Sequence, residues 1–250
     1  MLTRRKSNGR RQGRETRALP ARAGPMIKLP APQVRILPPP TKQALILGLN
    51  SDIARNIAGW LTADGWQVSG TTRAECDFAA SESIDKAVML IAQPWDLLLA
   101  CVGSLEPIGK FSGIHPDDWE RSVRINALGI LRMFHHLLPY RNAGASAVFF
   151  AGTNPLKRNP LYSAYSSAKA LLCRAVEEID AELDIKCFCI APGFVRTKIQ
   201  DVHDVSHRGE GTDHQDIYDC LKWCLARPKQ EIGGRTMHVP TWTRVWKEFA

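Results

Sequence analysis

The sequence has 250 residues, 44% hydrophobic and 23% charged, a composition typical of a globular protein and unlike that of collagenous, disordered or membrane-spanning chains. The formal charge is +8, but residues 1–43 contain eleven of the 33 Lys and Arg residues and a single acid, Glu15. Residues 44–250 therefore carry a formal charge of −2, which argues against nucleic-acid binding by the body of the chain, because backbone phosphates require a basic face.

Residues 1–42 form a basic tail rich in proline and arginine. Seven of the sixteen prolines lie in the first 40 residues, and such a segment buries too little apolar surface to offset its ordering entropy. We expect this tail to be disordered. Three interpretations remain open: an Arg-rich targeting segment, a tether to nucleic acid or membrane, or an over-extended start with Met26 as a later initiator.

From residue 43 onward, short apolar runs alternate with longer amphipathic runs, which is typical of βα units that build a parallel sheet. The fold class we predict is α/β, with one Rossmann-type doubly wound parallel sheet, helices on both faces, and one catalytic domain over residues 43–250. Strands are expected at 44–48, 66–71, 95–102, 146–151, 185–191 and 235–239. Helices are expected at 52–63, 81–92, 116–139, 161–182 and 213–226.

The first strand leads into a turn that suits a pyrophosphate. The sequence Gly48-Leu-Asn-Ser-Asp52 reads as a tight turn followed by a helix that Ser51 or Asp52 caps, and such a helix N-terminus presents backbone N–H groups to an anion. The later glycines of a dinucleotide fingerprint are replaced by Asp52 and Ala54. The residues expected to bind the dinucleotide here are Gly48, Asn50, Ser51, Asp52 and Ile53.

The second strand ends in Thr71-Thr72-Arg73, where NAD-binding folds place an acid on the ribose hydroxyls. Hydroxyls and a guanidinium suit a 2′-phosphate, which a carboxylate would repel. Thr72 and Arg73 therefore favour NADP(H) as the cofactor, with NAD(H) as the alternative.

Tyr165 and Lys169 carry the chemistry that we expect. A separation of four residues in a helix puts both side chains on one face, about one turn apart. An ammonium beside a phenol favours the phenolate, so we expect Lys169 to lower the pKa of Tyr165. The pair gains meaning from its neighbours, an apolar strand that ends in Gly152-Thr153 and the later segment Ile190-Ala-Pro-Gly193.

Together these segments make the chain resemble the short-chain dehydrogenase/reductase family, over about residues 43–240. The resemblance implies that Tyr165 is the acid/base, that Lys169 binds the nicotinamide ribose, and that Asn126 anchors a proton-relay water. It also implies adenine contact by Asp77 and Phe78, ribose contact near Gly103, and nicotinamide-side contacts from Pro192, Gly193, Val195 and Thr197.

The sequence departs from the family pattern near the reacting atoms. The serine that usually orients the substrate oxygen falls, by spacing from Tyr165, at Gly152, and we expect Thr153 to supply that hydroxyl instead. The family's Asn-Asn-Ala-Gly segment reads Ala100-Cys-Val-Gly103 and keeps only the glycine.

The sequence also allows expectations about metal binding, cellular location and oligomeric state. His203, His207 and His214 lie near loop glycines, and the seven cysteines lie mostly in apolar runs, so we expect reduced core thiols and no metal site. The sequence has no apolar run long enough to span a membrane and no apolar core of a secretory signal, which predicts a cytoplasmic protein. The family resemblance implies a homodimer or homotetramer.

The function we expect is an NADP-preferring oxidoreductase that interconverts a small-molecule carbonyl and an alcohol. Tyr165 acts as acid/base, Lys169 and Asn126 assist it, and Thr153 orients the oxygen. The alternative is a non-catalytic dinucleotide-binding or sensing protein on the same fold, which the altered serine position and the degenerate glycine turn favour.

Overall fold

The computed structural model describes residues 41–152, 158–195, 197 and 211–245, all within one compact unit, Pro40–Ala250. The tail expected to be disordered lies, up to residue 40, outside the described residues. In the described part of the chain, six strands form one sheet in the order β2-β1-β3-β4-β5-β6, and every neighbouring pair is parallel. The strands are β1 (Gln43–Leu47), β2 (Gln67–Thr71), β3 (Trp95–Ala100), β4 (Arg141–Phe150), β5 (Lys186–Ala191) and β6 (Thr236–His238).

The helices follow the strands in alternation, as the sequence pattern predicted. They are α1 (Asp52–Ala63), α2 (Ser81–Ile91), α3 (Pro116–Val123), α4 (Gly129–Leu137), α5 (Ser163–Glu182), α7 (His214–Ala226), α8 (Lys229–Ile232) and α9 (Val239–Val245). Short 3₁₀ turns cover Phe111–Gly113 and Leu138–Tyr140. The sequence pattern gave no indication of these two turns, of α8 or of α9.

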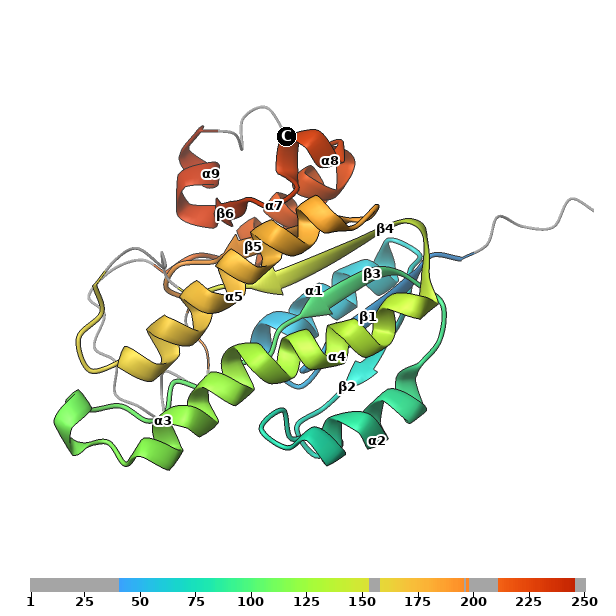
Figure 1. The fold of residues 1–250 in the computed structure, drawn as a ribbon. Helices are drawn as coiled ribbons and strands as arrows, with labels where there is room; N and C mark the ends of the chain where they lie inside the picture. The colour runs from blue at the N-terminus through green and yellow to red at the C-terminus, as the bar shows by residue number, and fades with distance from the viewer. Residues whose placement is uncertain (1–40, 153–157, 196, 198–210, 246–250) are drawn as a thin grey trace, which may run out of the picture. The chain divides into compact units, whose positions relative to one another are not determined.

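Side chains of the central strands alternate between two hydrophobic cores, because successive residues of a strand point to opposite faces. In β1, Leu45 and Leu47 belong to the core under α2, α4 and α5, whereas Ala44 and Ile46 belong to the core under α1, α7 and α9. Figure 1 shows α4 and α5 in front of the sheet and α1 behind it. The doubly wound α/β class is therefore confirmed.

The expected helix 116–139 is interrupted at its centre. Residues Arg124–Leu128 form a π-helical turn between α3 and α4, and the Gly129 amide N–H donates to the Arg124 carbonyl five residues back. Such π turns inside helices commonly mark functional positions. The turn contains Asn126, whose side chain is fully buried.

Helix α4 begins at a glycine because the neighbouring loop leaves no room for a side chain. A Cβ on Gly129 would lie 2.0 Å from the Phe78 carbonyl oxygen. The absence of a side chain therefore lets the helix and the Asp77–Phe78 loop approach each other closely.

Candidate active site

A cavity of about 820 Å³ opens at the carboxyl ends of β1, β3, β4 and β5. The chain leaves β1 for β2 on one side of the sheet, and β3 lies on the other side. The cavity therefore lies at the point where the strand order reverses, the position at which open α/β sheets bind their ligands.

The turn after β1 forms the floor of one end of the cavity. Gly48 has φ +82°, and a Cβ there would lie 3.1 Å from the Cys101 carbonyl oxygen. Ser51 caps α1, since its hydroxyl accepts a hydrogen bond from the Ala54 amide at 3.2 Å. Of the two residues expected as caps, Ser51 is the one that acts, and Asp52 is the first residue of the helix. The helix N-terminus faces the cavity and favours an anion there.

Of the two residues after β2 that were expected to bind a 2′-phosphate, Thr72 and Arg73, one faces the cavity. Arg73 lines the cavity. Thr72 is not among the lining residues, and its amide and hydroxyl donate to the Glu75 carboxylate at 2.8 and 2.9 Å. These hydrogen bonds lower the pKa of Glu75. This local partner of Thr72 was not predicted from the sequence, and Thr72 would have to release Glu75 to bind a phosphate.

Asp77 and Phe78 also line this end of the cavity. The Asp77 carboxylate accepts from the Ala79 amide at 2.9 Å and from the Arg121 guanidinium of α3 at 3.0 Å. The Ala79 hydrogen bond first, and then Arg121, lower the pKa of Asp77. Asp77 therefore remains ionised at neutral pH.

Lys169 is buried between two strand ends, with only 3% of its surface exposed. Its ammonium donates to the Val102 and Phe150 carbonyls, at 3.0 Å each. Burial lowers the pKa of Lys169 to about 8. The side chain is thus aimed from α5 at the loops that follow β3 and β4.

Tyr165 lines the same cavity one helical turn before Lys169. The Lys169 ammonium lies 5.9 Å from the centre of the Tyr165 ring. Burial raises the pKa of Tyr165 to about 12. The expectation that Lys169 lowers the pKa of Tyr165 was therefore wrong. Desolvation of the phenolate dominates, because the ammonium points toward the two carbonyls. Tyr165 is therefore a protonated acid at neutral pH.

Asn126 holds the loop after β3 through a two-point contact. Its side-chain carbonyl accepts from the Ser104 amide at 3.0 Å, and its NH₂ group donates to the Ser104 carbonyl at 2.9 Å. The same NH₂ group donates to the Ser122 carbonyl at 3.0 Å. Asn126 is not itself among the lining residues, but it fixes Gly103 and Ser104, which are.

Gly152 lies directly against Tyr165, the candidate acid. A Cβ at Gly152 would lie 2.9 Å from both the Tyr165 hydroxyl oxygen and one ring carbon. The tyrosine thus occupies the space that a serine side chain would need. Thr153, expected to replace that serine, lies outside the described residues.

A family model of short-chain dehydrogenases/reductases, described as enoyl-(acyl carrier protein) reductase, matches residues 61–223. The chain belongs to the short-chain dehydrogenase/reductase family.

Its curated relatives are distant. An uncharacterized oxidoreductase of Staphylococcus epidermidis is 25% identical over 124 residues, 48% of this chain and 54% of the relative. The 2,3-dihydro-2,3-dihydroxybenzoate dehydrogenase of Bacillus subtilis is 24% identical over 159 residues, 60% of this chain and 59% of the relative. The chain thus spans little more than half the length of these relatives.

Solved structures of short-chain dehydrogenases/reductases share this fold. A small-chain dehydrogenase in complex with NADPH superposes with a TM-score of 0.69 at 17% identity, covering 79% of this chain and 96% of that one. A glucose/ribitol-type member from Brucella melitensis gives 0.70 at 16% identity, covering 79% and 94%. An angucycline C-6 ketoreductase with bound NADP gives 0.69 at 16% identity, covering 79% and 93%.

Most predicted site residues of this short-chain dehydrogenase/reductase meet in the cavity. Fifteen line it: Gly48, Asn50, Ser51, Asp52, Ile53, Arg73, Asp77, Phe78, Gly103, Tyr165, Lys169, Pro192, Gly193, Val195 and Thr197. Residues that the sequence analysis missed line it too. They include Cys101, Ser104, Glu106, Arg121, Ile125, Phe150, Arg158, Asn159, Tyr162 and Phe194. Those directly after β3 and β4 could have been found from their position at strand ends, whereas Arg121 and Ile125 come from the helical segment after β3 and gave no signal.

The cavity residues fit a nicotinamide dinucleotide. Gly48 and Gly103 add no side chains to the cavity lining, and a Cβ at Gly103 would make only ordinary contacts, 3.4 Å from Asn126 and 3.8 Å from the Lys169 ammonium. Among the described residues, no group of three His, Cys, Asp or Glu side chains is placed to hold a metal ion. Among the same residues, no helix is both long and apolar enough to cross a bilayer.

If Tyr165 donates a proton to a substrate carbonyl, the two buried titratable groups predict the pH profile of that reduction. Tyr165 keeps its proton well above neutral pH, whereas Lys169 loses its charge as the pH rises through about 8. We expect the reduction rate constant to be flat from pH 6 to 7 and to fall above pH 8. Stopped-flow absorbance of NADPH at saturating substrate measures this profile. A rate that rises between pH 6 and 9 would contradict it, because the phenolate would then be the working form.

Proposed function

We propose that the protein is an NADP-preferring oxidoreductase that interconverts a carbonyl compound and an alcohol. The observation that carries the proposal is that Tyr165 and Lys169 line one cavity together with a helix N-terminus and Arg73. A module that only bound a dinucleotide would need no buried acid beside a buried ammonium.

The roles of the side chains follow from their places. The bound NADPH would supply a hydride to the carbonyl carbon. Tyr165 holds a proton on its hydroxyl at neutral pH, because its pKa is about 12. It can donate this proton to the forming alkoxide, which is a stronger base than the phenolate. Lys169 holds a positive charge beneath this site, and its two carbonyl acceptors fix the direction of its ammonium. Asn126 keeps the Gly103–Ser104 loop in place.

Arg73 supports the preference for NADP(H). It lines the cavity just after β2. Among the described lining residues, the first carboxylate after β2 is that of Asp77, four residues beyond Arg73. The guanidinium can bind a 2′-phosphate through two parallel hydrogen bonds. NAD(H) remains the alternative cofactor, since the Glu75 carboxylate already takes the donors of Thr72.

Replacing Arg73 by aspartate tests this preference. We expect the dissociation constant of NADPH to rise by about 100-fold and that of NADH by less than about 3-fold, because only NADPH has a 2′-phosphate for the new carboxylate to repel. Fluorescence titration of the reduced cofactors measures both constants. The Arg73→Gln variant, which removes the charge without reversing it, should fall between the wild type and Arg73→Asp. Equal weakening of NADPH and NADH would remove Arg73 from the phosphate site.

Consumption of NADPH with small aldehydes, ketones and quinones tests the activity itself. The alternative function, a dinucleotide-binding or sensing protein, is favoured by Gly152, which lacks the hydroxyl that the family places there. Tight NADPH binding with no turnover of any panel member would support that alternative. Reduction of one carbonyl class at a rate that depends on Tyr165 would exclude it.

We also infer that the protein is cytoplasmic and forms a homodimer or homotetramer. Leu128 of the π turn and Leu171 of α5 support the assembly, because 46% and 39% of their surfaces are exposed. Large apolar side chains exposed on helices favour contact with another subunit.

A further inference from the structure

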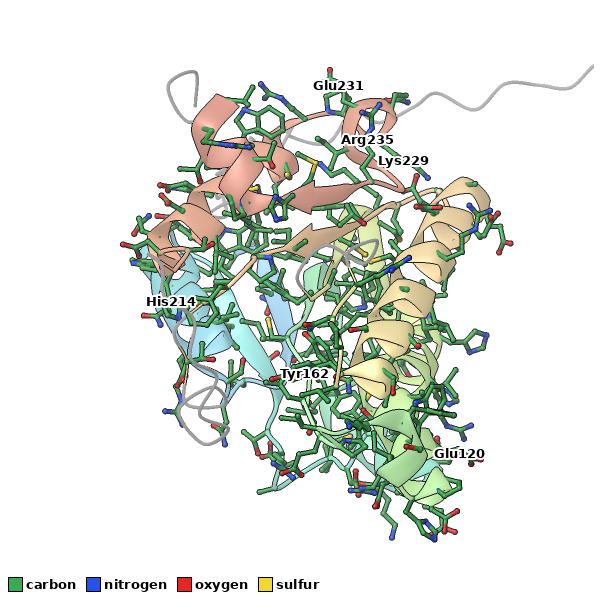
Figure 2. All side chains as sticks on the ribbon, turned by 90° about the vertical axis from the view of Figure 1, so that its left-hand side faces the viewer. Glu120, Tyr162, His214, Lys229, Glu231 and Arg235 are labelled. Carbon is green, nitrogen blue, oxygen red and sulfur yellow. The ribbon has the colours of Figure 1, made fainter. Side chains whose placement is uncertain are left out.

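Three arginines line the cavity, Arg73, Arg121 and Arg158, and Arg158 comes from a segment other than those of the first two. It lies in the segment between β4 and α5, together with Asn159 and Tyr162, which also line the cavity. Figure 2 shows Tyr162 beside the first turn of α5, the helix that carries Tyr165 and Lys169. Arg158 therefore belongs to the segment that leads into the helix carrying the proposed acid.

Arg158 lines the cavity without a protein partner among the residues that the structure describes. Arg121 is paired with Asp77, and Lys169 donates to two carbonyls. No hydrogen bond or ion pair joins the Arg158 guanidinium to any other residue that the structure describes. Glu106, another lining acid, already has an interaction of its own. An arginine that lines a cavity without a counter-ion can bind a ligand anion, because its planar fork matches carboxylate and phosphate oxygens.

A strained turn holds the backbone next to Arg158. Leu161 has φ +73°, a conformation that costs a non-glycine residue about 1 kcal/mol or more. The Tyr162 amide donates to the Asn159 carbonyl at 3.2 Å, and the Gly109 amide donates to the Leu161 carbonyl at 2.9 Å. The turn is thus tied both to α5 and to the loop after β3, which keeps this segment at the cavity.

The sheet geometry separates Arg158 from the proposed site of the 2′-phosphate. Arg73 follows β2 and Arg158 follows β4, and these strands are three positions apart in the sheet. Neighbouring strands lie about 4.8 Å apart, so the two strand ends are about 14 Å apart. A 2′-phosphate at Arg73 and a pyrophosphate at the α1 N-terminus both lie at the ends of strands other than β4, which leaves Arg158 for an anion of another molecule.

We propose that Arg158 binds an anionic group, a carboxylate or a phosphate, on the carbonyl substrate. Asn159 and Tyr162 supply further polar groups along the same wall. This inference rests on the proposed function, since it identifies the substrate class of that site. It predicts oxo acids or phosphorylated carbonyl compounds in preference to neutral ketones.

Matched pairs of substrates test the proposal. The pairs are 4-oxopentanoate with its methyl ester and dihydroxyacetone phosphate with dihydroxyacetone. For each pair, kcat/KM is measured at saturating NADPH in the wild type, Arg158→Gln, Arg158→Lys and Arg174→Gln. Arg174 is the matched control, because it is an exposed arginine of α5 that pairs with Glu177 and does not line the cavity.

We expect the wild type to prefer the anionic member of at least one pair by about 10-fold or more, and Arg158→Gln to remove most of that preference. Arg158→Lys should retain part of it, and Arg174→Gln all of it. The pair that responds tells whether the anion is a carboxylate or a phosphate. A preference near unity in both pairs, or an unchanged preference in Arg158→Gln, would overturn the proposal.

A binding measurement separates this proposal from the proposed activity. If none of the four compounds is reduced by the wild type, the activity toward them has failed, but their affinities still report on Arg158. Isothermal titration with 4-oxopentanoate and dihydroxyacetone phosphate, in the presence of NADP⁺, then decides. Binding that is lost in Arg158→Gln supports the anion site, and equal or absent binding in both proteins contradicts it.

Discussion

Replacing Tyr165 by phenylalanine is expected to reduce kcat for carbonyl reduction by about 10³-fold, within the range that one positioned acid contributes. The change removes a single oxygen from a ring that is packed on Gly152, so the fold has no cause to change. NADPH affinity should remain within about 3-fold of the wild type, because a substrate-side proton donor adds little to ground-state binding. Steady-state kinetics and fluorescence titration measure the two quantities.

Tyr140→Phe provides the control for this prediction. Tyr140 lies in the 3₁₀ turn before β4, is 40% exposed, and does not line the cavity. The same removal of a phenolic oxygen there should leave kcat unchanged. Full activity in Tyr165→Phe would remove the tyrosine from the mechanism, whatever the control shows.

Replacing Gly129 by alanine is expected to destabilise the protein by about 2 kcal/mol, although alanine is the better helix former. The new Cβ would lie 2.0 Å from the Phe78 carbonyl oxygen and 3.0 Å from the Arg124 carbonyl oxygen, both backbone atoms that cannot rotate away. The melting temperature should fall by about 4–8 °C, as expected for a domain of this size. Because Phe78 and Asp77 line the cavity, NADPH affinity should weaken as well.

Gly59→Ala is the matched control. Gly59 lies inside α1, and nothing lies within 4 Å of a Cβ placed there. Alanine at this position should stabilise the protein by up to about 1 kcal/mol, so the two substitutions have opposite signs. Thermal unfolding followed by circular dichroism measures both. Equal melting temperatures for Gly129→Ala and Gly59→Ala would contradict the close packing of α4 on the Phe78 loop.

The strands and most helices could be predicted because their hydrophobic patterns are strong. The apolar run of β1 and the amphipathic run of α1 are each bounded by turn residues, and both elements lie within one residue of the expected positions. The segment 116–139 shows why helix breaks are harder to predict. Its pattern is helical throughout, whereas its π turn depends on contacts of Asn126 and Gly129 with segments distant in the sequence.

The site was predictable where a residue type at a known spacing carries the chemistry, as for Tyr165 and Lys169. The pKa of Tyr165 was not, because the sequence shows the neighbouring charge but does not show the burial, and burial decides the direction here. The pairing of Thr72 with Glu75 was also missed. The acid was sought at the end of β2, whereas Glu75 lies three residues after Thr72 and folds back to it through a turn. Arg158 had no motif to mark it, and only the cavity reveals its place.

Hydride transfer is the step on which the proposed function depends, and deuterium can follow it directly. The measurement uses NADPH deuterated at both C4 positions, the carbonyl panel as substrates, and mass spectrometry of the alcohol products. We predict that an alcohol made by the wild type carries one deuterium on the former carbonyl carbon, and that Tyr165→Phe makes almost none of this labelled alcohol in the same time. Alcohol without label, or equal amounts of labelled alcohol from both proteins, would contradict this prediction.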